Sequence, residues 1–93
     1  MKINDATQLN ELRGQMDRIN SQMAALFAER QQVARAIGQW KNANGLPITD
    51  PVREEAILRQ YAKGDPQTED FFRQLFRLAK EAEGPGAQEG ESR

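Results

Sequence analysis

The sequence predicts an all-α fold, a three-helix chain in which the first helix is very long. Apolar residues recur at spacings of three and four over residues 9–37, the pattern of one helix face. Two shorter segments with helical periodicity follow, separated by turns that contain Gly and Pro, and no segment alternates like a strand. The apolar stripe of the first helix consists of Leu9, Leu12, Met16, Ile19, Met23, Leu26, Val33 and Ile37.

The first helix is expected from about Thr7 to Asn44. Asp5 or Thr7 can cap its N-terminus, and Asn44 with Gly45 supplies a left-handed stop. At 1.5 Å per residue this helix spans ~54 Å, whereas a compact domain of this length is only ~32 Å across. Because the apolar stripe continues along the excess length, we expect a second chain to cover it in a homodimer. The alternative is a bent or broken helix.

The second helix is expected from Asp50 to about Ala62. Asp50 is a favourable N-cap and Pro51 suits the first helical position, while Lys63 and Gly64 close the segment. The residues expected to face inward are Val52, Ala56, Ile57 and Tyr61.

The third helix is expected to open at Pro66 or Thr68 and to end at the Gly-Pro-Gly sequence of residues 84–86. Its broad aromatic face predicts a core contact. Residues 1–83 are therefore expected to form one helical domain, and the small, polar residues of 84–93 a disordered C-terminal tail. The aromatic face consists of Phe71, Phe72, Leu75, Phe76, Leu78, Ala79 and Ala82.

Composition narrows the classes of function. The 93 residues contain no Cys and no His, which excludes thiol chemistry and removes the commonest general base and metal ligand. Thirteen basic and fourteen acidic residues give a formal net charge of −1, which argues against nucleic acid or an anionic membrane as partner. The sequence has neither a signal peptide nor a long apolar run, so we expect a cytoplasmic protein without a metal ion.

Two cations interrupt the apolar stripe or lie close to it. Arg30 occupies the position between Leu26 and Val33, and Lys41 follows eleven residues later, ~16 Å along the helix. A buried cation costs several kcal/mol unless an anion meets it. The anion is either a carboxylate of another helix, such as Glu55 for Arg30, or a ligand such as a small dianion. Lys41 alone could instead extend to solvent.

Other charged residues can join these two. Arg13 lies too far along the helix to share a ligand with Arg30 of the same chain, but it can approach Arg30 of the other chain in an antiparallel dimer. Arg53 and Glu54 lie in the first turn of the second helix, directly after the Asp50 cap. Together they predict a pocket rich in hydrogen-bond donors, with acids that can accept from a hydroxyl group.

The order and spacing of these residues closely resemble the all-helical chorismate mutases. The resemblance covers about residues 8–60 without a gap, and it implies an intertwined homodimer of three-helix chains. It rests on Leu12-Arg13, Ile19, Leu26-Phe27-Ala28-Glu29-Arg30, Gly38-Gln39-Trp40-Lys41 and Leu46-Pro47-Ile48-Thr49-Asp50-Pro51-Val52-Arg53-Glu54.

The resemblance implies a role for each matched residue. Arg13 of the partner subunit and Arg30 would grip the substrate carboxylates. Lys41 would bind a carboxylate and the ether oxygen of the breaking bond. Asp50 and Glu54 would hold the ring hydroxyl. The remaining matched residue, which would line the site, is Arg53.

The third helix departs from the family pattern of a small polar residue followed, four positions later, by Gln or Glu. Alignment on Leu75 and Phe76 places these positions at Glu83 and Ala87, and the match there favours this register. A shift by one turn places them at Ala79 and Glu83 instead. In both registers one polar contact to the substrate is missing or is replaced by a carboxyl group.

The resemblance therefore implies an isomerase, a chorismate mutase of aromatic amino-acid or secondary-metabolite biosynthesis. Such an enzyme converts chorismate to prephenate by a unimolecular Claisen rearrangement without metal or cofactor. Two relatives on the same scaffold remain as alternatives, a 4-amino-4-deoxychorismate mutase and an isochorismate pyruvate-lyase. A non-catalytic helical dimerisation module is the alternative from a different class.

Overall fold

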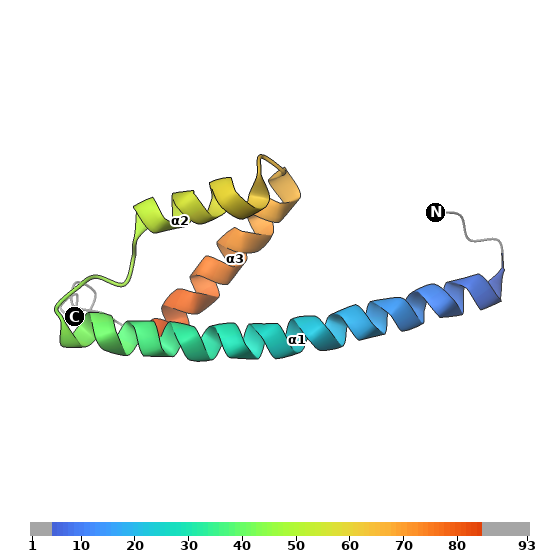
Figure 1. Ribbon diagram of the computed structural model, residues 1–93, viewed down its shortest axis with the longest axis horizontal. Coiled ribbons are helices and arrows are strands. Elements are labelled where there is room, and N and C mark those ends of the chain that lie inside the picture. The colour runs from blue at the N-terminus through green and yellow to red at the C-terminus, as the bar shows by residue number, and fades with distance from the viewer. Residues whose placement is uncertain (1–4, 85–93) are drawn as a thin grey trace.

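The computed structural model describes residues 5–84, and in this part of the chain it confirms the all-α prediction. α1 spans Ala6–Ala43, α2 spans Pro51–Ile57 and continues into a π-helical turn, η1, at Leu58–Ala62, and α3 spans Pro66–Glu83. α3 packs on the C-terminal part of α1 and η1 packs on α3, whereas α2 stands away from α1, and the N-terminal part of α1 extends beyond all three (Figure 1). Periodicity and helix caps predicted one long and two shorter helices, and the described part of the chain has them.

α1 is a continuous helix of 38 residues. The Asp5 carboxylate accepts from the backbone N–H of Gln8 at 2.9 Å, and Gly45 adopts a positive φ of 68° after the last turn. The molecule is 58 Å long and has a radius of gyration of 17.9 Å, against ~12 Å for a compact chain of this length. The bent or broken helix is thereby ruled out, and the expected excess length is present.

The second helix differs from the prediction in its last turn. The Asp50 carboxylate caps the Arg53 N–H at 3.1 Å as expected, but residues 58–62 form the wider π-helical turn. This turn directs Leu58 and Ala62 into the core. In the single chain Val52 of α2 is 80% exposed and Tyr61 of η1 is 54% exposed, so the prediction that they face inward was wrong.

α3 begins at Pro66 behind an Asp65 cap. The hydroxyl and the backbone N–H of Thr68 both donate to the Asp65 carboxylate and hold its pKa below the ordinary value. Phe76 and Ala79 are buried, whereas Phe71 is half exposed. The helix ends at Glu83, and the predicted tail lies outside the described residues except for its first residue.

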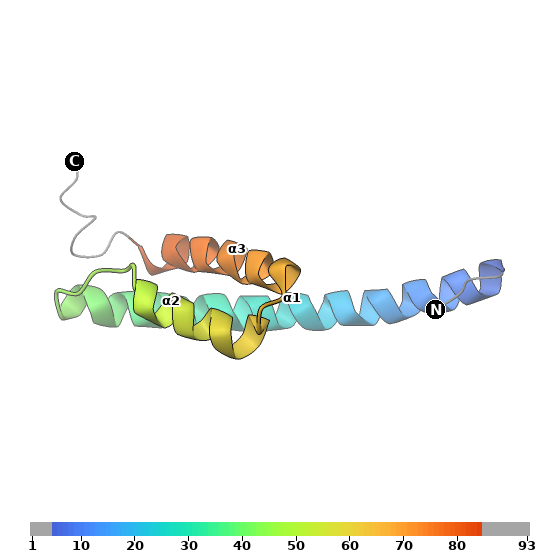
Figure 2. The ribbon, with the colours of Figure 1, turned by 90° about the horizontal axis from the view of Figure 1, so that it is seen from above.

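The hydrophobic core of the described chain is small. Its largest cluster is Leu58, Ala62 and Phe76, with Ile57 and Phe72 packed against them. The other buried apolar residues are Ala34, Ile48 and Ala79. The stripe of α1 contributes little to this core, because most of its residues are exposed, and α2 and α3 run along only the C-terminal part of the helix (Figure 2). Its exposed members are Met16, Ile19, Met23, Leu26, Val33 and Ile37.

Gly38 brings α1 and α3 unusually close together. A Cβ atom at this position would lie 2.3 Å from the carbonyl oxygen of Glu83. Only glycine leaves room for this approach, which places the last turn of α3 beside the C-terminal part of α1. The contact fixes the position along α1 at which Glu83 lies beside that helix.

Candidate active site

A cavity of about 460 Å³ lies between α1, the loop after it, α2 and α3. We call it the charged cavity. It brings together six of the seven predicted site residues: Arg30, Lys41, Asp50, Arg53, Glu54 and Glu83. Its apolar lining consists of Val33, Ala34, Ile37, Ile48, Ile57, Phe76 and Ala79, and its remaining charged residue is Lys80.

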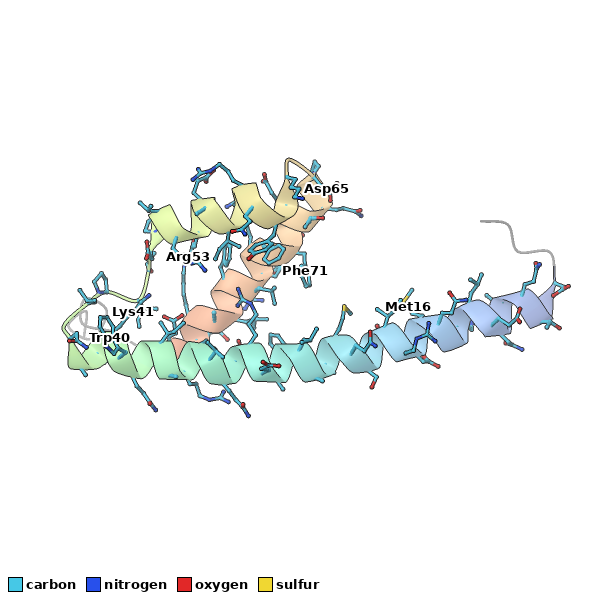
Figure 3. All side chains as sticks on the ribbon, in the orientation of Figure 1. Met16, Trp40, Lys41, Arg53, Asp65 and Phe71 are labelled. Carbon is cyan, nitrogen blue, oxygen red and sulfur yellow. The ribbon has the colours of Figure 1, made fainter. Side chains whose placement is uncertain are left out.

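Lys41 points into the fold, so it does not extend to solvent as the alternative interpretation held. Its side chain is only 18% exposed. The ammonium group donates to the backbone carbonyl of Ile48 at 2.9 Å and lies 3.6 Å from the Glu83 carboxylate. Figure 3 shows Lys41 near the C-terminal end of α1, with Arg53 on α2. The Ile48 carbonyl fixes the ammonium group at the cavity wall.

Glu83 is the most enclosed acid of the cavity, with a side chain that is 11% exposed. Its Oε1 atom is buried and accepts no hydrogen bond from the described residues, because the 3.6 Å separation from Lys41 is an ion-pair distance. Such an oxygen has capacity for a further donor.

Arg30 and Arg53 carry positive charge without a carboxylate partner among residues 5–84. The suggested structural pair of Arg30 with Glu55 does not form among the described residues, and Glu55 instead lies 3.9 Å from Arg59. Arg30 is half-buried on α1. Among the described residues, these two guanidinium groups remain available for an anion.

Sequence reasoning missed Lys80, which joins α3 to α2. Its ammonium group lies 3.0 Å from the Glu54 carboxylate, and both side chains are half-buried. Lys80 lies three residues before Glu83 and therefore on the same face of α3. This spacing would have identified Lys80 once Glu83 was known to face the cavity. The charged cavity thus has four cations, including Lys80, and three carboxylates.

Arg13 is the predicted site residue that does not line the cavity. It is exposed on the part of α1 beyond α2 and α3, the same part on which Figure 3 labels Met16. Within one chain it cannot contact a ligand in the cavity.

The last turns of α3 bear on the two possible registers. Ala79 and Glu83 both line the charged cavity, as the register shifted by one turn requires. In the other register the second position is Ala87, which lies outside the described residues.

A second cavity, an apolar groove of about 730 Å³, lies between α1 and α3. Arg30 borders both this groove and the charged cavity. The apolar groove is otherwise lined by Asn20, Met23, Ala24, Leu26, Phe27, Phe71, Phe72, Gln74, Leu75 and Leu78.

Comparison with known proteins supports the resemblance that the site residues indicated. The sequence pattern of the family described as chorismate mutase type II matches residues 12–83. The chain belongs to this family. The chorismate mutase of Methanocaldococcus jannaschii is 32% identical over 74 residues, which are 76% of this chain and 75% of that protein.

Two further relatives and one solved structure are also similar. The intracellular chorismate mutase of Mycobacterium tuberculosis is 29% identical over 78% of this chain and 70% of its own length. The bifunctional chorismate mutase/prephenate dehydratase of Aquifex aeolicus is 35% identical over 83% of this chain but only 17% of its own length. A conserved hypothetical protein from Pyrococcus furiosus has a TM-score of 0.77 and 32% identity, over 85% of this chain and 99% of that one.

Membership of the family makes the protein an isomerase of the chorismate mutase type. Among residues 5–84, no helix is long and apolar enough to cross a membrane.

Proposed function

We propose that the protein catalyses the unimolecular Claisen rearrangement of chorismate to prephenate. The observation that carries the proposal is the convergence of Arg30, Lys41, Arg53 and Glu54 on one cavity, in a chain of the chorismate mutase type II family. None of the described residues that line this cavity carries a hydroxyl, thiol or imidazole group. The cavity is therefore suited to a reaction that needs charge and shape.

The rearrangement makes two demands on the site. The ether C–O bond breaks while a C–C bond forms between the enolpyruvyl arm and the ring, so the arm must be held over the ring. Negative charge grows on the ether oxygen as that bond stretches, and a positioned donor stabilises it. The reaction transfers no proton to the protein and oxidises nothing.

Arg30 and Lys41 meet these demands from α1. Arg30 has no carboxylate partner within the described chain, so its guanidinium can bind a substrate carboxylate in a bidentate manner. The Lys41 ammonium donates one of its three N–H groups to the Ile48 carbonyl, and the other two can donate to a carboxylate and to the ether oxygen. Arg53 adds positive charge at the wall formed by α2.

Asp50 and Glu54 recognise the ring hydroxyl in this proposal. Asp50 already caps α2 through the Arg53 N–H, so its second oxygen is the one that can accept from a ligand. Glu54 holds Lys80 with Oε2 and has Oε1 for the hydroxyl. Lys80 also disfavours a substrate with an ammonium group at this position, which weighs against the 4-amino-4-deoxychorismate alternative.

Arg13 completes the site from a partner subunit. Because Arg30 borders both cavities, a second α1 lying along the apolar groove brings its side chains next to Arg30. In an antiparallel pair that places Arg13 of one chain beside Arg30 of the other, the crossing point falls between residues 21 and 22. These residues lie within the segment of α1 that lines the groove.

The proposal is tested by incubating the purified protein with chorismate in a buffer containing a metal chelator and identifying the product by NMR. We expect prephenate as the sole product, at a rate that the chelator does not change. Parallel reactions contain the 4-amino-4-deoxy analogue or isochorismate. Turnover of either compound without turnover of chorismate would replace the proposed substrate, and turnover of none would leave the non-catalytic dimerisation module.

A further inference from the structure

We propose that Lys80 is a positioning residue that makes the site prefer a neutral hydroxyl over a cationic group on the substrate ring. The inference rests on the proposed function, because it concerns the ring substituent that Glu54 would bind. Lys80 matches none of the positions from which the substrate contacts were predicted, and it lies on a different helix from Glu54.

Among the described residues, an ion pair links the start of α2 to the end of α3. The Lys80 ammonium lies 3.0 Å from Oε2 of Glu54, and both residues line the charged cavity. The apolar contacts between these helices lie at the other end of α2, where Leu58 and Ala62 pack against Phe76. Lys80 therefore fixes the side chain of Glu54 where the core does not reach.

The charge of Lys80 changes what Glu54 can recognise. A lone carboxylate attracts an ammonium group more strongly than it attracts a hydroxyl. With a cation 3.0 Å away, the carboxylate is already neutralised in part, and a second cation at its free oxygen meets repulsion. A neutral hydroxyl meets no such repulsion and still donates to Oε1.

The predicted effect is a change in discrimination between two substrates. The Lys80 side chain is 36% exposed, so solvent screens its charge, and we expect a factor of ~10 in selectivity. Removal of the charge should raise kcat/KM for the analogue with an amino group in place of the ring hydroxyl, relative to kcat/KM for chorismate. A role limited to tying α2 to α3 would lower both values by the same factor.

The experiment measures kcat/KM for chorismate and for the amino analogue in the wild-type protein, Lys80→Met, Lys80→Arg and Arg77→Met. Lys80→Met removes the charge but keeps an unbranched side chain, and Lys80→Arg keeps the charge and should retain wild-type selectivity. Arg77→Met is the matched control, because Arg77 is an exposed cation of α3 that pairs with Glu81 at 3.3 Å, outside the cavity. Melting temperatures verify that each variant is folded.

The inference holds if Lys80→Met alone shifts the selectivity ratio by ~10-fold toward the amino analogue. It is overturned if the ratio in Lys80→Met stays within twofold of wild type, or if Arg77→Met shifts it equally. A wild-type protein that is inactive on chorismate removes the proposed function and this inference together. Should Lys80→Met fail to fold, Lys80→Gln replaces it, and the same ratio decides.

Discussion

Arg30 and Lys41 lie on one helix and line one cavity, but they differ in their local partners. Lys41 is held by the Ile48 carbonyl and faces Glu83, whereas Arg30 has no carboxylate partner in the described chain. A ligand with two carboxylates can place one of them beside Lys41 and the other beside Arg30, which has no carboxylate partner of its own. Both cations should therefore contribute to transition-state stabilisation in the proposed reaction.

We predict that Arg30→Ala and Lys41→Ala each lower kcat/KM for chorismate by at least ~100-fold, as the loss of a charge-stabilising donor generally does. Steady-state kinetics measure the effect, and circular dichroism verifies the helical content. Arg35→Ala is the control, because Arg35 is an exposed cation of α1 that does not line the cavity. Near-normal turnover of either site variant would contradict the assignment.

A second prediction at this scale concerns Glu83. An ionised carboxylate accepts hydrogen bonds and repels the negative charge that develops on the ether oxygen, whereas an amide can donate to it. Since Glu83 lies 3.6 Å from Lys41 at the cavity wall, Glu83→Gln should keep or raise kcat/KM at neutral pH. This expectation belongs to the register in which Glu83 takes the position beside the ether oxygen. Steady-state kinetics at neutral pH measure kcat/KM, and a large loss of kcat/KM in Glu83→Gln would contradict this role for Glu83.

Among the elements, the ends of the helices were the most predictable from the sequence, because each is determined by neighbouring residues. Asp50 and Pro51 open α2 as expected, and Gly45 follows α1. The π-helical turn at 58–62 was not predictable, because it depends on how Leu58 meets Phe76 across the chain. Lys80 was missed because its ion pair with Glu54 joins two helices, and such a contact is not visible in the local sequence.

The contact between α1 and α3 at Gly38 yields a prediction for the elements. In Gly38→Ala the new methyl group would lie 2.3 Å from the Glu83 carbonyl oxygen, so the end of α3 must move. We expect a loss of ~1–3 kcal/mol in stability and a fall in kcat, because Glu83 and Lys80 shift with the helix. Urea unfolding and kinetics measure the two effects.

Gly14→Ala is the matched control for this contact. Gly14 also lies inside α1, but a Cβ atom there has no neighbour within 4 Å in the single chain. Alanine is the better helix former by ~1 kcal/mol, so this variant should be no less stable than wild type. If both variants behaved alike, the close approach of α1 and α3 would not constrain the site.

At the scale of the whole molecule, the described chain lacks enough core to cover its first helix. Residues of the stripe such as Met16, Met23 and Leu26 are about half exposed or more, and the apolar groove continues this surface onto α3. Exposed apolar area of this extent marks an interaction site. The length of α1 was predictable from periodicity and caps, whereas the position of a partner chain depends on contacts that a single sequence does not contain.

We therefore predict a homodimer whose long helices lie against one another, with Arg13 of each chain serving the site of the other. Light scattering at micromolar concentration should give twice the chain mass of 10.5 kDa.

Arg13→Ala and Arg30→Ala homodimers should both be inactive, because every site lacks one arginine. In a mixed dimer one site lacks both arginines and the other regains both, so exchange of the two variants should restore up to about a quarter of wild-type activity at random mixing. The control is Arg30→Ala mixed with Lys41→Ala, in which every site retains a defect if both residues act within their own chain. A fully active single chain, or no recovery on exchange between folded dimers, would contradict the shared site.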